Sequence, residues 1–268
     1  MTAAHRSLSH GSRLVVLVLA LHVSTVFGGS PPTSGFRPLN HTGVIDETVL
    51  KKFEGTYYVG TDNTVVENLE IRGNIVVEAK NVTIRNIRLN SGTPWHAIIV
   101  ADEASGFTLQ DSDIDGGGGT VNGVLGFGLF LRNSIRGVDN GINVTGPSII
   151  RENHIFGLFS RKGGHYDGIE INGGHDIEIT GNDIVNDHGQ TSAVMMNNEF
   201  SGLSNIVIEN NRLVGGGYTV YLDGRKGGGA VNAASIRIIT NEIGAGHWGE
   251  FAFYDSKPVV EGNQPTSH

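Results

Sequence analysis

The sequence predicts an all-β protein, a parallel β-helix (β-solenoid) of about nine coils. Three observations predict this fold. A short phrase recurs along most of the chain, and its apolar residues alternate with polar ones, as in a strand with one buried face. No long segment within the repeats has the apolar spacing of a helix. Stacked coils would bury a continuous interior, which isolated coils could not do.

The recurring phrase is clearest at residues 205–213, with further copies at 176–184 and 235–243. Each copy contains an anchor apolar residue. The anchors are Val66, Ile84, Leu109, Leu131, Ile150, Ile179, Ile208, Ile238 and Val260. In seven copies a second apolar residue follows five positions later, and the Leu131 copy is one residue short and has Ile135 there. This double spacing predicts two strands per copy, separated by a tight bend.

Asparagine recurs three residues beyond the anchor in the later copies. These residues are Asn153, Asn182, Asn211, Asn241 and Asn263. Asparagine tolerates the left-handed conformation and bonds to nearby backbone, so it suits a tight bend between strands. Equal positions of successive coils stack on each other. The spacing therefore predicts an asparagine ladder at one corner, with a structural role.

A further apolar strand lies between successive phrases. Examples are residues 140–144, 167–171, 192–196, 218–222 and 250–253. Longer insertions precede several of these strands, at 157–166, 186–191 and 244–249. Loops at corresponding positions of a solenoid project from the same side, so we expect them to build one binding surface.

The two ends of the chain differ from the repeats. Residues 1–29 have the pattern of a secretory signal peptide, with Arg6 and Arg13 before an apolar run that is too short to span a bilayer. We expect a linker and N-terminal cap over 30–63, the β-helix over 64–263 and a C-terminal tail over 264–268. A short helix or irregular cover is expected at 45–53, because an open solenoid end exposes strand edges. The expected location is extracellular, without stable membrane insertion.

Composition excludes several function classes. The formal net charge is −8, which argues against nucleic acid as a partner because phosphate binding needs a basic face. The chain has no cysteine, so thiol catalysis and cysteine-ligated zinc are excluded. Clusters of Asp and Asn allow calcium, yet no calcium-loop spacing occurs. No cofactor is therefore assigned, and a monomer is favoured.

Residues 161–170 hold the densest set of chemically useful side chains. The candidate catalytic residues are Arg161, Lys162, His165, Tyr166 and Asp167. Neighbouring coils lie about 4.8 Å apart, so residues at equal positions could reach one substrate. The candidate substrate-binding residues are Asp139, Glu170, His188, Tyr218, Tyr221, Arg225, His247 and Trp248. Such a row resembles a sugar-binding cleft. The alternative is that these side chains are solvated loop residues or packing groups.

Chemistry on a uronic acid polymer needs three groups. A cation must neutralise the substrate carboxylate, a base must remove the neighbouring proton, and an acid must assist the leaving oxygen. Arg161, Lys162 or Arg225 suit the first role, and His165 or Tyr166 the other two. A hydrolase would instead need two carboxylates at a defined separation. Asp139, Asp167 and Glu170 are the candidates for that alternative.

Three segments, 35–44, 165–170 and 215–221, carry a resemblance to a known group of proteins. They resemble secreted right-handed parallel β-helix proteins of the pectate-lyase-like superfamily, and more narrowly a group found in actinobacteria and their phages. The likeness covers most of 35–263. It implies a β-helix that serves as a polysaccharide lyase, hydrolase or epimerase, or as a non-enzymatic phage or surface protein. The calcium-binding acidic cluster of pectate lyases and the paired aspartates of polygalacturonases have no clear match here.

These observations together favour a secreted enzyme that acts on a polysaccharide, with a lyase on an acidic, uronate-containing polymer as the first hypothesis. An epimerase or a glycoside hydrolase on the same fold is the alternative within the enzymes. His165-Tyr-Asp167 is loosely similar to the His/Asp signature of alginate epimerases. A glycan-binding or surface-attachment protein without catalysis is the alternative from another class, and there these residues would serve packing alone.

Overall fold

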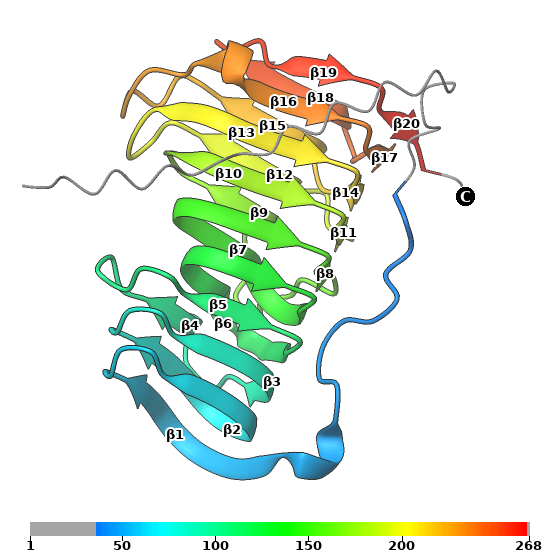
Figure 1. Ribbon diagram of the computed structural model, residues 1–268. Helices are drawn as coiled ribbons and strands as arrows, with labels where there is room; N and C mark the ends of the chain where they lie inside the picture. The colour runs from blue at the N-terminus through cyan, green and yellow to red at the C-terminus, as the bar shows by residue number, and fades with distance from the viewer. Residues whose placement is uncertain (1–35, 267–268) are drawn as a thin grey trace, which may run out of the picture. The chain divides into compact units, whose positions relative to one another are not determined.

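Parallel pairing joins each turn of the chain to the next in the computed structural model, which describes residues 36–266 (Figure 1). Every ladder between the named strands of this part of the chain is parallel. Helical structure among these residues is confined to two short 3₁₀ turns, η1 (Glu47–Val49) and η2 (Ala233–Ser235). The all-β prediction is confirmed. The right-handed turn and the count of about nine coils stay predictions.

The strands stack in three ladders, and the longer strands bend round corners to serve more than one ladder. The first ladder contains parts of β2 (Val65–Val77), β3 (Thr83–Asn90), β6 (Asp113–Leu131) and β7 (Ser134–Arg151), with β5 (Thr108–Gln110), β10 (Gly174–Thr180), β13 (Leu203–Glu209), β16 (Ile236–Ile239) and β19 (Val259–Glu261). The second contains parts of β1 (Lys51–Val59), β2, β3, β6 and β7, with β8 (His154–Ile155), β11 (Asp183–Asn186), β14 (Arg212–Gly215), β17 (Glu242–Gly244) and β20 (Gln264–Pro265).

The third ladder carries the candidate site. It contains parts of β1, β2, β6 and β7, with β4 (His96–Val100), β9 (Asp167–Ile171), β12 (Ser192–Asn197), β15 (Tyr218–Asp223) and β18 (Gly249–Tyr254). In Figure 1 the strands follow one another in chain order from β1 towards β19 and β20. The residue pairings confirm that the further apolar strands, predicted between successive phrases, stack in register.

The apolar interior is built from the predicted anchors, with two corrections. Val260 in β19 is in register with Ile238 but is 38% exposed. The residue in register between Leu109 and Ile150 is Phe130, not Leu131. Residues 129–131 are all apolar, so the alternation alone did not identify the inward one. With Phe130 as anchor, Ile135 lies at the regular five-residue spacing, and the irregularity of that copy disappears. Phe130 and Ile135 are both fully buried.

The predicted asparagine ladder is present and has one more rung, Asn133, three residues after Phe130. Each amide nitrogen donates to the amide oxygen of the next rung at 2.9 Å. Each also donates to an anchor backbone carbonyl of the preceding coil, as Asn182 does to Ile150 at 2.8 Å. The left-handed residue is the one before the rung, for example Glu152 with φ 56°. The asparagine side chain therefore links coils, and its neighbour makes the bend.

Strand pairing extends beyond the boundaries expected for the repeats. β1 lies within the segment 30–63 expected as linker and cap, and its residues pair with β2 from Lys51 to Val59. Gln264 and Pro265, expected in the tail, pair with β17 as β20. The signal peptide predicted over 1–29 lies outside the described residues. Within 36–266, no helix has the length and apolar character needed to cross a membrane.

The segment before β1 runs alongside the coils (Figure 1). The backbone N–H of Gly43 donates to the Arg132 carbonyl at 2.9 Å, and that of Ile45 to Oδ1 of Asn86 at 2.8 Å. Glu47 in η1 pairs with Arg88 at 2.5 Å. These contacts place the segment against the side of the early coils, whereas the sequence predicted a cover over their open end.

Candidate functional site

The loops that precede the third-ladder strands stack on one another. The backbone N–H of Thr191 donates to the Tyr166 carbonyl at 3.0 Å, and that of Gly217 to the Thr191 carbonyl at 2.9 Å. The N–H of Trp248 in turn donates to the Gly217 carbonyl at 2.7 Å. The prediction that these loops lie on the same side of the coils is confirmed for this part of the chain, and their role as a binding surface stays a prediction.

A column of polar side chains occupies equivalent positions on five strands of the third ladder. We call it the polar column, and it consists of His96, Asn122, Asn140, Asp167 and Ser192. All but His96 are buried. Nδ2 of Asn140 donates to Oδ1 of Asn122 at 3.1 Å, and the backbone N–H of Ser192 donates to Oδ1 of Asp167 at 3.1 Å. The column is thus bonded from coil to coil.

Glycine follows the column residue on the three central strands, and the packing explains why. A Cβ on Gly123, Gly141 or Gly168 would lie 2.8, 2.6 or 2.2 Å from the Cγ2 of a second-ladder isoleucine. A real Cβ does not approach another carbon so closely, so a larger residue would force the coil apart. Glycine therefore lets the corner close, with the polar column residue held beside it.

Asp167 and Glu170 are the two carboxyls of strand β9. Asp167 is 2% exposed, and burial raises its pKa well above its usual range, helped by the charge of Glu170. Burial also raises the pKa of Glu170, against the opposing effects of an Asn172 hydrogen bond and the His165 charge. Desolvation disfavours the charged form of a carboxyl, so both groups tend to retain a proton.

The Glu170 carboxylate is held by amides. Nδ2 of Asn140 donates to Oε2 of Glu170 at 2.9 Å, and Nδ2 of Asn143 donates to the same oxygen at 2.5 Å. Glu170 alternates with the buried Ile169 and Ile171 along its strand, so it faces outward and remains half-buried. Of the carboxyls in this cluster, Glu170 combines a raised pKa with access from outside.

His165 and Asp139 lie beside this pair. His165 is exposed and lowers the pKa of Glu170 by its charge, so the imidazole lies within electrostatic reach of the carboxyl. No hydrogen bond joins His165 to Asp167 in the described part of the chain. Oδ1 of Asp139 accepts the backbone N–H of Tyr166 at 3.0 Å, which confirms the predicted proximity of Asp139 to that residue.

Tyr166 and His188 pack on each other. Their rings are stacked with centroids 3.7 Å apart, and Tyr166 is 8% exposed. The Tyr166 hydroxyl donates to the Ser160 carbonyl at 3.4 Å, and Nε2 of His188 lies 2.6 Å from the Leu158 carbonyl. The structure therefore places both residues as packing partners between loops, and Asp167 beneath them as a buried group.

The predicted cations differ in their surroundings. Arg161 and Lys162 are exposed, and no salt bridge to either occurs within residues 36–266. Arg225 makes two hydrogen bonds of 2.8 Å to the Asp223 carboxylate and lies 3.9 Å from the Tyr254 ring centroid. Its charge is already engaged, so Arg161 and Lys162 are the cations left to meet a substrate carboxylate.

The aromatic candidates extend the row that contains Glu170. Met195 pairs with Glu170, and Tyr221 pairs with Met195, so Tyr221 lies two coils from the carboxyl. Tyr218 is half-buried at the start of the same strand. His247 and Trp248 lie in the next loop, with ring centroids 4.3 Å apart, and Trp248 is 68% exposed. An exposed indole beside such a row is suited to stack on a sugar ring.

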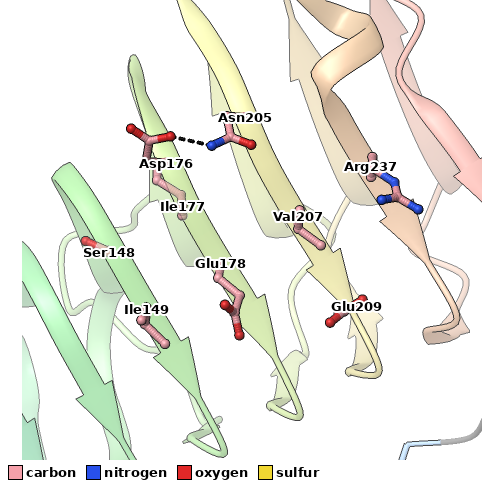
Figure 2. A pocket seen from close by; sticks show the side chains of 9 residues that line it. All are labelled: Ser148, Ile149, Asp176, Ile177, Glu178, Asn205, Val207, Glu209 and Arg237. Carbon is pink, nitrogen blue, oxygen red and sulfur yellow. Dashed lines mark hydrogen bonds between the residues drawn. The ribbon is translucent and has the colours of Figure 1, made fainter. Parts of the chain in front are cut away.

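A hollow of about 450 Å³ lies on the first ladder, across β7, β10, β13 and β16 (Figure 2). It contains none of the predicted site residues. Asp176 there is hydrogen-bonded to Asn205, as Figure 2 shows, and this bond, together with His175, lowers its pKa. Glu178 pairs with Arg151 at 2.6 Å. The lowered pKa favours the ionised form of Asp176, so Asp176 is less suited than Glu170 to donate a proton.

Within residues 36–266, no group of three or more His, Asp or Glu side chains is arranged to hold a metal ion. The calcium considered from the sequence therefore has no such cluster in this part of the chain.

Sequence reasoning missed the amides that hold the site together, Asn122, Asn140 and Asn143. A signal for two of them was present. Asn122-Gly-Val, Asn140-Gly-Ile and Asp167-Gly-Ile are one motif repeated on successive third-ladder strands. Aligning these strands with one another predicts that Asn122, Asn140 and Asp167 stack. Asn143 lies outside that motif. Its role depends on the conformation of the Glu170 side chain, whose Oε2 accepts its hydrogen bond.

Comparison with known proteins supports the fold. No protein-family model matches the chain, and no curated protein sequence matches it significantly. Among solved structures, the A-module of the mannuronan C-5 epimerase AlgE6 of Azotobacter vinelandii is similar, with a TM-score of 0.55 at 14% identity. The match covers 77% of this chain and 65% of that module, which is less than two thirds of its length. The chain thus has a parallel β-helix fold, which it shares with that module.

Proposed function

We propose that the chain is an enzyme that removes the C5 proton from a uronate unit of an acidic polysaccharide, with His165 as base and Glu170 as proton donor. The observation that carries this proposal is the half-buried Glu170 carboxyl. Its pKa is raised by burial, two amides hold one of its oxygens, and an imidazole lies within electrostatic reach. A carboxyl whose pKa is raised and which lies within reach of an imidazole is suited to acid–base catalysis.

The chemistry follows from the substrate's own carboxylate. The imidazole of His165 takes the proton from C5, and the electron pair of that bond moves into an enolate on the carboxylate. Arg161 or Lys162, exposed in the preceding loop, supplies the positive charge that this enolate requires. In a lyase the pair then forms a C4–C5 double bond and expels O4, which takes the Glu170 proton. In an epimerase Glu170 returns a proton to C5 from the opposite face.

The two outcomes have different support. The sequence favoured β-elimination, the lyase reaction. One similar solved structure is the A-module of a mannuronan C-5 epimerase, which favours epimerisation as the second candidate. Hydrolysis has less support, because it needs two carboxyls that flank the bond. Asp167 is 2% exposed, and Asp139 is engaged by the Tyr166 backbone.

The test uses alginate, glucuronan, pectate and hyaluronan in D₂O, with and without calcium. Epimerisation predicts deuterium at C5 of the polymer, measured by NMR. Elimination predicts rising ultraviolet absorbance from the unsaturated uronate. If no polymer shows either signal or releases reducing ends, the enzymatic proposal is contradicted. A non-catalytic glycan-binding or surface protein then becomes the better account.

The setting of this activity is part of the same proposal. We propose an extracellular monomer released by cleavage near Gly28 or Gly29, based on the signal-peptide pattern of residues 1–29. We also propose that the chain is related to the actinobacterial and phage group that it resembles. N-terminal sequencing of the protein recovered from culture medium, followed by sedimentation analysis, tests the cleavage and the oligomeric state.

A further inference from the structure

One backbone group determines the orientation of the amides around Glu170. The N–H of Asp167 lies 3.3 Å from Oδ1 of Asn140. A backbone N–H can only donate, so the amide oxygen of Asn140 must face it. The amide nitrogen of Asn140 therefore points the other way, towards Asn122 and Glu170. This orientation does not depend on any free choice between the oxygen and nitrogen of the amide.

The orientation propagates along the polar column. Nδ2 of Asn140 meets Oδ1 of Asn122 at 3.1 Å, so Nδ2 of Asn122 faces Nδ1 of His96 at 3.0 Å. That ring nitrogen must accept, which places the ring hydrogen on Nε2. Burial lowers the pKa of His96, in agreement with a neutral ring. The donor and the acceptor are therefore defined for each hydrogen bond between neighbouring members of the column from His96 to Asn140.

At Glu170 the same logic separates the two carboxyl oxygens. Oε2 accepts from Nδ2 of Asn140 at 2.9 Å and from Nδ2 of Asn143 at 2.5 Å. A proton on Oε2 would point a hydrogen at amide hydrogens, so the protonated carboxyl must carry it on Oε1. We infer that Asn140 and Asn143 are positioning residues that fix Oε2 of Glu170 as an acceptor, so that the proton is delivered from Oε1, the oxygen that neither of these two amides contacts. The inference rests on the proposed role of Glu170 as proton donor.

The amides also affect when Glu170 releases its proton. Four titratable groups act on it: Asp139 from β7, His165 from the preceding loop, Asp167 from its own strand, and Glu199 after β12. Amide N–H groups favour the ionised carboxylate. Removing the Asn143 donor therefore removes a stabilising contact from the charged form, and Glu170 should hold its proton to higher pH.

The experiment measures this titration directly. Protein labelled with ¹³C in the glutamate carboxyls is titrated by NMR, and the Glu170 signal is assigned with Glu170→Gln. We expect Asn143→Leu to raise the Glu170 midpoint by about one pH unit, the size expected for one lost bond to a charged group. Asn143→Gln keeps an amide and should restore part of the shift. Asn74→Leu, a half-buried strand amide far from the site, is the matched control and should leave the midpoint unchanged.

The outcomes separate this inference from the proposed function. An unchanged Glu170 midpoint in Asn143→Leu, accompanied by a higher KM on a reactive polymer, overturns the inference and assigns Asn143 to the substrate. A shifted midpoint supports the inference even if no polymer reacts, in which case the proposed function alone falls. Where a polymer does react, the pH profile of the reaction should move in the same direction as the midpoint in Asn143→Leu. A profile that stays fixed while the midpoint moves contradicts the assignment of Glu170 as the donor.

Discussion

Asp167 is a carboxyl at a position where the neighbouring strands carry amides. Asn122 and Asn140 occupy the same column on the two preceding strands, and each can make its bonds without a charge. Asp167 makes one bond from the Ser192 N–H while lying 2% exposed. A lone buried carboxylate is costly to ionise. The buried carboxyl of Asp167 therefore lowers the stability of the folded chain, although the site keeps it.

Asp167→Asn should stabilise the fold at alkaline pH. Because the folded-state pKa of Asp167 is raised by burial, the folded chain holds a proton that the unfolded chain has lost. Wild-type stability is therefore fullest below the ordinary carboxyl pKa and falls as pH rises towards the raised folded-state pKa, by about 1.4 kcal/mol per pH unit. The variant lacks this loss. Denaturant unfolding at several pH values should show an advantage for Asn that grows with pH, and an equal difference at every pH would contradict this account.

The asparagine ladder shows how one side chain joins three coils. Asn182 donates to Asn211 at 2.9 Å and to the Ile150 carbonyl at 2.8 Å, and its own oxygen accepts from Asn153. All three side chains are buried. Within the stack, hydrogen bonds between amides take the place of hydrogen bonds to water. A missing rung therefore leaves its neighbours with fewer hydrogen-bond partners.

Removing a central rung should destabilise the protein strongly. Asn182→Ala leaves the Asn153 amide and the Asn211 oxygen with fewer partners in a dry interior, and we expect a loss of about 3 kcal/mol in the free energy of unfolding. Asn90→Ala, at an exposed strand end, is the control and should change stability little. Urea titrations of the two variants compare them. Equal stability would show that water replaces the missing amide.

Trp248 should report a bound polysaccharide. The chain has only two tryptophans, so Trp95→Phe leaves Trp248 as the one indole reporter. Because Trp248 is 68% exposed and lies in the loop stack beside the Tyr221 strand, a uronate oligomer that lies across these strands should change its fluorescence. Titration with oligomers of increasing length measures the effect. A saturable change that survives in Trp248→Phe but is absent from the Trp95→Phe background would place the ligand elsewhere.

Periodicity explains why the strands and the ladder could be predicted and much of the site could not. Stacking forces equal positions into register, so anchors, the Asn rungs and the loop side follow from spacing. The same spacing is ambiguous at residues 129–131. Three successive apolar residues occur there, so the alternation does not identify which side chain faces inward. The Tyr166–His188 stack joins two insertions whose paths have no period. Asp167 has the same strand parity as the buried Ile169 and Ile171, so its inward position follows from the alternation along β9.

Across the whole molecule, continuous parallel ladders set the geometry available to a substrate. Strands in a sheet lie about 4.8 Å apart, so side chains on one row of the third ladder recur at that interval. Asn143, Glu170, Met195 and Tyr221 form such a row, with the stacked loops beside it. A polymer lying across the strands would meet a hydrogen-bonding amide, the acid and an aromatic ring in turn. The core and its hydrogen-bond ladders hold this row, in a chain without cysteine.

The measurement that tests the account most directly is the C5 reaction of wild-type protein and its Glu170→Gln and His165→Ala variants, on each uronate polymer in D₂O. The account predicts deuterium at C5 or unsaturated ends with the wild type, and a loss of about 10²- to 10⁴-fold in rate for each variant, because each lacks one proton-transfer group. His175→Ala, an exposed histidine on the first ladder, is the control and should react as the wild type does. If Glu170→Gln reacts at the wild-type rate, the proton does not come from Glu170 and the central claim is contradicted.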